Sequence, residues 1–251
     1  MNCTNFRPGE RLDDLQHNGL VIIQNRNQFC FGTDSVLLAH FASQDKGAKH
    51  ICDLGTGSGV LPLLLSDSIP QASFIGVEIQ PEVCDMAKRS VAINSLEKRI
   101  EIRELNLIEA PDVFGKGSFD MVICNPPYGK RGTCVLCNNS AKNIARHEIM
   151  CTLEEIIETA SKLLCNGGRF YMVHQCERML EILDLLREFY LEPKKIQLVH
   201  PQISKPPYLA LFEAVKCQKG NMQILPPLVV YDEDGNYTAD LQKIYGLSAA
   251  K

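Results

Sequence analysis

The chain has 251 residues, of which 45% are hydrophobic and 22% are charged, and its formal net charge at pH 7 is −4. These values disfavour wholesale disorder, collagen and coiled-coil structures, and they argue against a uniformly basic coat for nucleic acid. No segment reaches the roughly 20 consecutive apolar residues that span a bilayer, and the first residues lack the apolar centre of a signal peptide, so we expect a cytoplasmic protein without a membrane partner.

The N-terminal residues are predicted to form a hairpin and a helix. Residues 19–31 contain two β-branched or aromatic runs around a polar turn at residues 25–27, a pattern typical of a hairpin. Thr33 or Asp34 is expected to cap a helix that ends near Ser43.

Strands alternate with helical segments from residue 50 onward, which indicates right-handed crossovers and a parallel sheet covered on both faces. The predicted strands lie at 50–55, 74–79, 100–104, 119–125, 169–174, 195–200 and 208–215, and the helices at 60–68, 81–96, 153–164 and 177–189. The last two strands are joined by a short link, so one of them is expected to be antiparallel. After residue 217 we expect a strand at 228–231, a turn and a short helix.

The helix predicted at 81–96 is expected to cover the sheet. Pro81 marks its start, and Val83, Ala87 and Val91 fall on one face at helical spacing. The charged residues on the opposite face are expected to be solvated.

The cysteines are numerous, at eleven in the chain. Most lie in apolar contexts, such as Cys52, Cys124 and Cys165, and the chain is not small. We therefore expect reduced thiols in the core and not disulfides.

A glycine-rich segment, DLGTGSG at residues 53–59, joins the first strand of the alternating region to its helix. Glycine suits such a turn because it has no Cβ and tolerates positive φ. A dinucleotide site would require G-x-G-x-x-G, but Val60 stands at the third glycine position, so the NAD fingerprint fails. A tight structural turn is the alternative to a ligand site.

Two acids end neighbouring predicted strands, Asp53 the first and Glu78 the second. In an open parallel sheet both carboxylates project from the carboxyl edge, where ligands bind. We expect Asp53 to face an ammonium group or the loop amides, and Glu78 to accept hydrogen bonds from two ribose hydroxyls. The pair indicates a nucleoside that carries a cationic amino-acid tail.

A second motif, Asn125-Pro126-Pro127-Tyr128, follows the strand at 119–125. The two prolines fix φ and remove two donors, so the turn presents its carbonyl groups stiffly. The Asn125 side-chain oxygen and the Pro126 carbonyl are expected to accept hydrogen bonds from one planar amino group, with the Tyr128 ring stacked on its plane. Such acceptors stabilise an amine that gains positive charge during methyl transfer. An ordinary proline turn is the alternative.

The two motifs resemble those of class I S-adenosylmethionine-dependent methyltransferases that act on amino groups, over roughly residues 30–217. More narrowly, FGTDSVLLAHFA, ARHE and KPPYLALFEAVK are similar to the bacterial tRNA1(Val) family that methylates the 6-amino group of adenine 37. The resemblance implies a Rossmann-like α/β fold with a seven-stranded, mostly parallel sheet, one antiparallel strand, helices on both faces and a small N-terminal hairpin. It also implies S-adenosyl-L-methionine as cofactor and tRNA as the substrate.

The resemblance also assigns roles to single residues. The cofactor would be bound by Asp53, Gly55, Thr56, Gly57 and Gly59, with Glu78 on its ribose and Asn106 beside its adenine, where an acid is commoner in the family. The catalytic residues would be Asn125, Pro126, Pro127 and Tyr128, which would hold a target base extruded from its stack.

Four basic residues are candidate contacts for the RNA phosphates. They are Lys130, Arg131 and Arg146, around a segment at 129–143 that departs from the family, and Lys205 in the Lys-Pro-Pro-Tyr turn. Solvated surface charge is the alternative for the first three, and a plain β-turn for the last.

A cysteine pair, Cys134 and Cys137, also lies in the departing segment. It supplies only two ligands, and zinc would need Cys124, Cys151 or His147 as well, so we expect no metal.

The chain is expected to form a single domain, with an N-terminal hairpin and helix at 1–45, a catalytic core at 46–217 and a C-terminal extension at 218–251. No obligatory protein partner is evident.

Three alternatives to a tRNA methyltransferase stay open: a glutamine-amide methyltransferase acting on a translation release factor, a DNA adenine methyltransferase, and a non-catalytic RNA-binding scaffold. The intact motifs disfavour the scaffold, the N-terminal hairpin disfavours the release-factor family with its helical domain, and the lack of a target-recognition domain disfavours DNA.

Overall fold

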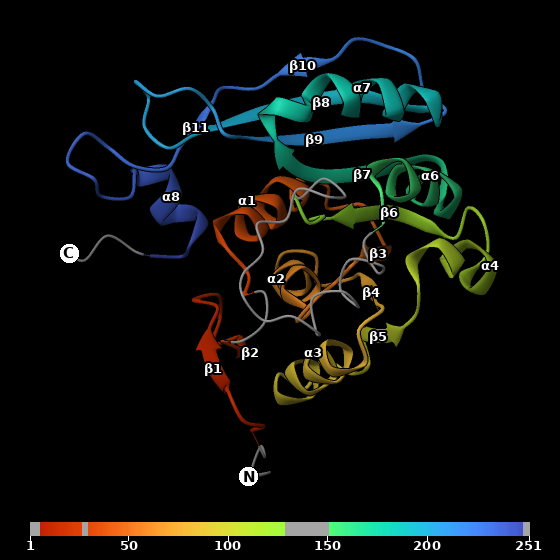
Figure 1. Ribbon diagram of the computed structural model, residues 1–251, viewed down its shortest axis with the longest axis vertical. Helices are drawn as coiled ribbons and strands as arrows, with labels where there is room; N and C mark the ends of the chain where they lie inside the picture. Colours follow the sequence, from red (N-terminus) through yellow and green to blue (C-terminus); the bar gives the residue numbers. More distant parts are fainter. Residues whose placement is uncertain (1–5, 27–29, 129–150, 248–251) are drawn as a thin grey trace, which may run out of the picture.

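The protein is built on one large twisted sheet, seen in a computed structural model that describes residues 6–26, 30–128 and 151–247 (Figure 1). Eight strands follow the order β10-β8-β9-β7-β6-β3-β4-β5, and β11 also pairs with β8. The seven long strands are β3 (His50–Leu54), β4 (Ser73–Glu78), β5 (Ile100–Glu104), β6 (Phe119–Cys124), β7 (Leu164–Gln175), β8 (Leu191–His200) and β9 (Leu209–Lys216).

The strand directions agree with the predicted α/β fold. Strands β3, β4, β5, β6 and β7 pair in parallel, whereas β9 is antiparallel to both β7 and β8. The seven-stranded sheet with one antiparallel strand is thereby confirmed. The C-terminal extension adds two very short strands that the sequence did not indicate as sheet members, β10 (Gln223–Ile224) and β11 (Leu228–Val229), both parallel to β8.

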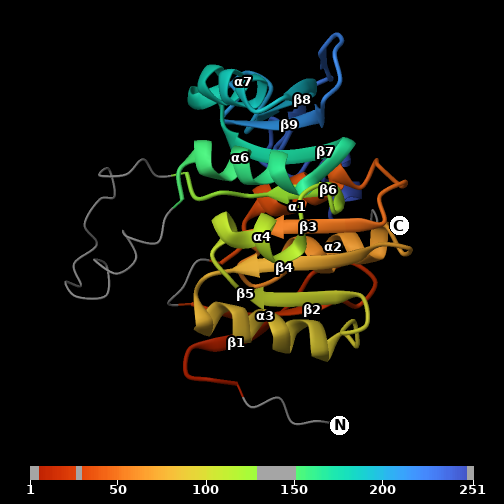
Figure 2. The same cartoon turned by 90° about the vertical axis from the view of Figure 1, so that its right-hand side faces the viewer.

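Helices cover both faces of the sheet, as Figure 2 shows in a view turned by 90°. One face packs against α1 (Thr33–Ala42), α2 (Val60–Ser68) and α3 (Pro81–Ile93), and the other against α4 (Ala110–Phe114), α6 (Leu153–Leu163) and α7 (Met179–Glu188). The short 3-10 helices η1 (Leu107–Glu109) and η2 (Cys176–Arg178) precede α4 and α7. The two buried apolar clusters on either side of the sheet are the core.

Helix α3 has the predicted apolar face, with Val83, Ala87 and Val91 buried against the sheet and the hairpin. Its charged face is not simply solvated. Arg89 binds Glu10 through two guanidinium nitrogens at 2.8 and 2.5 Å, and the Glu10 side chain is only 4% exposed. The prediction of a solvated charged face was therefore wrong at Arg89.

The N-terminal hairpin exists, but the sequence assigned its strands wrongly. Strand β2 (Val21–Asn25) pairs antiparallel with β1 (Glu10–Asp14), and Phe31 belongs to no strand. The chain reverses at residues 15–20, where Gln16, Asn18 and Gly19 have positive φ. The error arose because β1 is mostly charged and has no apolar alternation, so its sequence does not resemble that of a strand.

The C-terminal extension lies against α1 and the edge of β8. Its helix α8 (Ala239–Ile244) buries Leu241 and Ile244 in the same cluster as α1, and Leu228 and Val230 join them. The expected strand at 228–231 is limited to its first two residues, followed by an isolated bridge between Tyr231 and Tyr237.

The cysteines of the described segments are all free thiols; Cys52 and Cys124 are buried, whereas Cys165 is half-buried. Within residues 6–26, 30–128 and 151–247, no helix has the length and apolarity needed to cross a membrane.

Candidate active site

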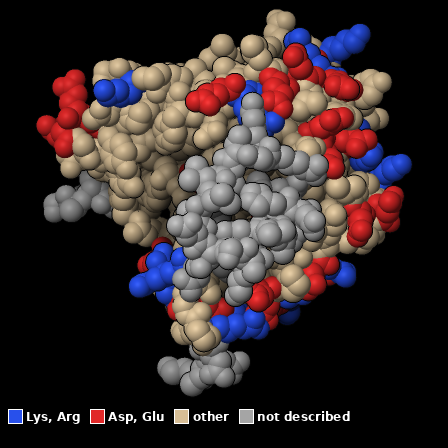
Figure 3. Space-filling view, viewed as in Figure 1, with Lys and Arg blue, Asp and Glu red and all other residues tan. Residues whose placement is uncertain are grey.

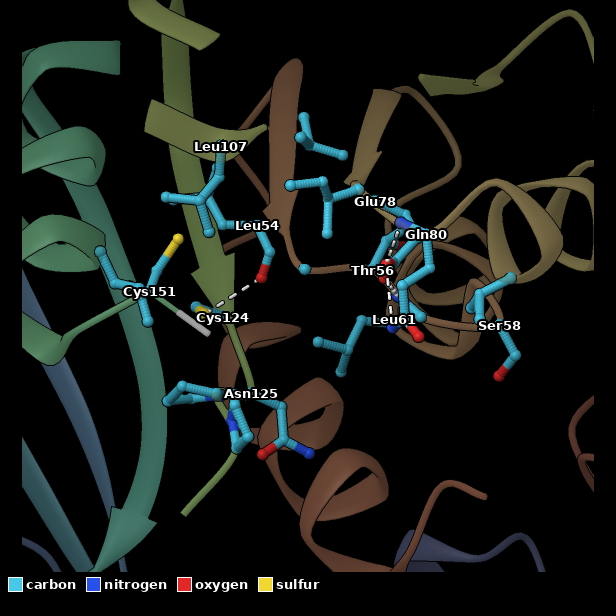
Figure 4. A pocket seen from close by; sticks show the side chains of 18 of the residues that line it. Leu54, Thr56, Ser58, Leu61, Glu78, Gln80, Leu107, Cys124, Asn125 and Cys151 are labelled. Atoms are coloured by element: carbon cyan, nitrogen blue, oxygen red, sulfur yellow. Dashed lines mark hydrogen bonds between the residues drawn. The ribbon is translucent and has the colours of Figure 1, made fainter. Parts of the chain in front are cut away.

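A cavity of about 370 Å³ opens at the carboxyl ends of β3, β4, β5 and β6. These ends meet because β3 pairs with both β4 and β6, with Asp53 opposite Gly76 on one side and Ile123 on the other. Figure 4 shows Asn125 and Cys151 on one side of this first cavity and Glu78 and Gln80 on the other. Of the predicted site residues, it is lined by Gly55, Thr56, Gly57, Glu78, Asn106, Asn125, Pro126, Pro127 and Tyr128.

The glycine loop forms one wall of the first cavity. Gly55, Gly57 and Gly59 have φ of +73°, +57° and +87°, a region that residues with a Cβ rarely adopt. The amides of Gly55 and Thr56 both donate to the Val77 carbonyl at 2.9 Å, so the loop is fastened to β4. Gly59 caps α2 and does not line the cavity.

Glu78 is held in place by the loop. One carboxylate oxygen accepts from the Gly57 amide at 3.1 Å, and the other accepts from the Gln80 amide at 2.9 Å. The side chain is buried and lines the cavity. The oxygen bonded to the Gln80 amide also accepts from the Gln80 side chain at 3.3 Å, whereas the oxygen bonded to Gly57 keeps a second lone pair for a ligand hydroxyl.

Asp53 does not occupy the place that the sequence suggested. It is 1% exposed, does not line the cavity, and accepts no hydrogen bond from any residue that the structure describes. The loop amides bond to Val77 and Glu78 instead, so of the two partners expected for Asp53 the loop amides are wrong, and an ammonium group stays a prediction. Burial raises the pKa of Asp53 to about 7; the nearby Thr56 hydroxyl offsets part of the rise, and Glu78 adds to it.

Asn106 follows β5 and lines the first cavity. Its side-chain oxygen accepts from the Ile108 amide at 3.2 Å and thereby caps η1. This bond orients the side chain and leaves one lone pair and the NH₂ group for other partners.

The Asn-Pro-Pro-Tyr turn is fastened to the start of α1. The Asn125 amide donates to the Ser35 hydroxyl at 2.9 Å, and its oxygen accepts from the Tyr128 hydroxyl at 3.2 Å. Tyr128 also donates to Asp34 at 2.6 Å. The four side chains form one network that fixes the Asn125 oxygen at the cavity wall.

Tyr128 packs against a buried histidine. The rings of Tyr128 and His174 meet edge to face with centroids 5.2 Å apart. Burial lowers the pKa of His174 to about 4, and burial together with Asp34 raises the pKa of Tyr128 well above its usual range. Both rings are therefore neutral at physiological pH.

Three residues of this site were not assigned by sequence reasoning. Thr33 or Asp34 was expected to cap the helix, which was wrong, because the N-cap of α1 is Gly32; in the first turn, the Asp34 and Ser35 side chains instead bond to the second motif. His174 gave no signal because it lies within an apolar strand. The polar Thr33-Asp34-Ser35 run ahead of a hydrophobic helix was the one feature that pointed to the first two.

Of the predicted RNA contacts, the structure describes only Lys205. It is exposed, in the turn between β8 and β9, and does not line the first cavity. Lys130, Arg131 and Arg146, like Cys134 and Cys137, lie outside the described residues. Among the residues that are described, no group of three or more His, Cys, Asp or Glu side chains is arranged to hold a metal ion.

Solved structures support the fold. A predicted O-methyltransferase from Agrobacterium tumefaciens superposes with a TM-score of 0.69 at 23% identity, over 86% of this chain and 98% of that one. A 16S rRNA N2 methyltransferase from Thermus thermophilus, solved with AdoMet and guanosine, has a TM-score of 0.59 at 18% identity, over 84% of this chain and 51% of that one. Both show the same class I methyltransferase architecture.

Comparison with related sequences identifies the family to which the chain belongs. A protein named tRNA1(Val) (adenine(37)-N6)-methyltransferase in Parabacteroides distasonis is 31% identical over 183 residues, 72% of this chain and 75% of its own. One of the same name in Porphyromonas gingivalis is 31% identical over 156 residues, so the chain spans about 60% of that relative's length. The family model described as "Methyltransferase small domain" matches residues 25–197. The chain therefore belongs to the methyltransferase small domain family, as a relative of the bacterial tRNA1(Val) (adenine(37)-N6)-methyltransferases.

Proposed function

We propose that the protein transfers a methyl group from S-adenosyl-L-methionine to the exocyclic 6-amino group of adenine in tRNA. The observation that carries this proposal is that one cavity joins the glycine loop, Glu78 and Asn106 to the Asn-Pro-Pro-Tyr turn. The name shared by the curated relatives supports adenine 37 of a tRNA(Val) as the target.

The residues present suit S-adenosyl-L-methionine, which supplies an electrophilic methyl group when bound. Glu78 presents two carboxylate oxygens to a pair of ribose hydroxyls, and Asn106 offers its amide to the adenine ring. Asp53 has two buried oxygens without a partner in the described segments, which fits a nearby cation such as the sulfonium or ammonium group. A carboxylate at this place attracts a cation of this kind and repels a phosphate.

Asn125 is proposed to bind the target amine. Its side-chain oxygen and the Pro126 carbonyl would accept the two amino hydrogens, which turns the nitrogen lone pair toward the methyl carbon. As the nitrogen forms its bond to that carbon, the carbon–sulfur bond would break and leave its electron pair on sulfur as a neutral thioether, and the two acceptors would stabilise the positive charge developing on the nitrogen. The amine then loses one proton to solvent, so no dedicated base is required.

Positive side chains are proposed to hold the RNA backbone. Lys205 is exposed and directly precedes Pro206 in the turn before β9, and Lys130, Arg131 and Arg146 lie outside the described residues. Contacts of this kind set the position of the RNA without reading its sequence.

The first experiment is to incubate the protein with radiolabelled S-adenosyl-L-methionine and unmodified total tRNA, with release factor in a parallel reaction. We expect label in tRNA as N6-methyladenosine. Label only in release factor would overturn the RNA substrate in favour of a glutamine amide, and label in neither would leave only the family assignment.

A single variant tests the role of the second motif. Asn125→Ala is expected to abolish methyl transfer while cofactor affinity changes little, because Asn125 is proposed to contact the amine and not the cofactor. Asn221→Ala, an exposed asparagine far along the chain, is the matched control and should retain activity. Undiminished transfer by Asn125→Ala would remove the assigned role.

A further inference from the structure

A second cavity, of about 600 Å³, lies next to the first. The two cavities share Asp34 and Tyr128 as lining residues. The other walls of the second cavity come from the segment before α1, from the end of β7 with η2, and from the turn before β9. Its principal lining residues are Gln175, Cys176, Glu177, Pro206, Pro207 and Tyr208.

Tyr208 gives the second cavity an aromatic wall. Its side chain is 41% exposed although its backbone is fixed at both ends, since its amide donates to Val199 at 3.0 Å and its carbonyl accepts from the Cys176 amide at 3.2 Å. Two prolines precede it and stiffen the turn. A fixed, half-exposed aromatic ring is a platform for stacking a planar group.

The polar groups of the second cavity favour a base over a phosphate. Gln175 and Glu177 are exposed, and in the described part of the chain their side chains have no hydrogen-bond partner. Asp34 is already bound to Tyr128 and to the Ser35 amide. Carboxylate and amide oxygens accept from the amino and ring N–H groups of bases, whereas the negative charge repels phosphate.

We propose that the second cavity binds the base of the nucleotide directly adjacent to the methylated adenine, stacked on Tyr208. This inference rests on the proposed function, which puts the target base in the first cavity. Asp34 and Tyr128 line both cavities, so the second cavity adjoins the proposed site of that base. Lys205, exposed just before the two prolines, is positioned for the phosphate outside the cavity. Figure 3 shows a broad area without charged side chains over α1 and α8.

A chemical double-mutant cycle in binding tests this proposal. The RNA is an anticodon stem-loop of tRNA(Val) with adenine at position 37, prepared intact and with an abasic nucleotide on either side of that adenine. Dissociation constants are measured by fluorescence anisotropy for the parent protein, Tyr208→Ala and Tyr208→Phe. Ile203→Ala, an exposed apolar change in the same turn that does not line the cavity, is the matched control.

Tyr208→Ala is expected to weaken binding of the intact RNA by about tenfold, in line with the loss of one base–aromatic stack. Tyr208→Phe and Ile203→Ala should bind like the parent. On one of the two abasic RNAs the tenfold difference between parent and Tyr208→Ala should vanish, because the stacked base is already missing. An equal loss on the intact and both abasic RNAs overturns the proposal, as does a failure of the parent to bind the stem-loop.

This experiment separates the two proposals because it needs no turnover. Suppose that RNA is not methylated, but that the affinity difference between the parent and Tyr208→Ala vanishes on one abasic RNA. The methyltransferase proposal then fails, and the second cavity remains a base-binding site. If RNA is methylated but the losses are additive, the activity stands and the second cavity is not the site of the neighbouring base.

Discussion

At the scale of single residues, Asp53 links the stability of the protein to pH. Its carboxyl group is 1% exposed, and its pKa of about 7 lies well above the usual value near 3.8, mainly because burial disfavours the charged form. In the ligand-free protein the folded state therefore binds a proton that the unfolded state releases between about pH 4 and 7.

The free energy of unfolding is therefore expected to fall as pH rises. The contribution of Asp53 to stability is present below pH 4 and is lost as pH rises through 7, by up to about 4 kcal/mol. Asp53→Asn should therefore be more stable than the parent at pH 8 and similar to it at pH 4. Urea unfolding across this range measures the difference, with the exposed Asp112→Asn as control. A difference that does not grow with pH would show that Asp53 titrates normally.

Ser35 is expected to act through Asn125. Its hydroxyl accepts the Asn125 amide and so determines which side of that amide faces the cavity. Ser35→Ala should lower kcat by about tenfold, a loss of about 1.4 kcal/mol, while cofactor affinity is unchanged. Steady-state kinetics with tRNA and equilibrium cofactor binding distinguish the two effects, with Ser68→Ala at the end of α2 as the matched control. An unchanged kcat would mean that the prolines alone orient Asn125.

The sequence was informative about these residues where a motif is continuous. The glycine loop and the Asn-Pro-Pro-Tyr turn are local patterns, and both were located from the sequence alone. The bond from Asp34 to Tyr128 joins residues 94 positions apart, and no local rule predicts it. Likewise, the bond from the Gly57 amide to Glu78 joins residues 21 positions apart, and no local pattern predicts it.

At the scale of elements, β4 needs a glycine where it packs against the glycine loop. A Cβ on Gly76 would lie 2.8 Å from both Ile102 and the Thr56 hydroxyl. Gly76→Ala should destabilise the protein by about 1–3 kcal/mol and weaken cofactor binding, since Thr56 belongs to the loop. Thermal unfolding and calorimetric titration measure the two effects. Gly47→Ala, where the new Cβ has only an ordinary contact, should change neither.

The hairpin is anchored to α3 by an ion pair between Glu10 and Arg89. The guanidinium lowers the pKa of Glu10, whose side chain is 4% exposed. Glu10→Ala should reduce the free energy of unfolding by about 2–3 kcal/mol, because it leaves Arg89 without its main partner. The double variant Glu10→Ala/Arg89→Ala should lose less than the sum of the single losses in urea unfolding. Additive losses would show that the two side chains do not interact.

The elements differ in how far the sequence determines them. Strand and helix alternation from residue 50 predicted every long strand of the sheet, because β3, β4 and β6 are nearly continuous apolar runs and β5 alternates apolar with charged residues. Strand β1 was missed because four of its five residues are charged and no apolar alternation marks it; among these residues, all of which the structure describes, only Glu10 is paired with α3. Strand β10 was missed because it has only two residues, too few for any alternation to show, and β11 covers only the first two residues of the strand expected at 228–231.

At the scale of the whole molecule, the C-terminal extension connects the far edge of the sheet to the active site. Its first strands cover the edge of β8, and its last turn places the Tyr245 hydroxyl 3.0 Å from Thr33, next to Asp34. Tyr231, Tyr237 and Tyr245 stack between these points with centroids about 5.5 Å apart. The extension thereby supports the segment that holds Tyr128.

This arrangement predicts that the extension and the core unfold as one domain. Leu241 is fully buried in the cluster that contains α1, so Leu241→Ala should lower stability by about 2–5 kcal/mol. If the chain is a single cooperative unit, the whole calorimetric transition shifts, and cofactor binding and tyrosine fluorescence report the same midpoint. A separate early transition, seen by tyrosine fluorescence but not by cofactor binding, would instead make the extension an independent unit. In that case its contact with Thr33 could not stabilise the hydrogen-bond network that Asp34 and Ser35 form with the Asn-Pro-Pro-Tyr turn. Truncation after Cys217 would then leave methyl transfer intact.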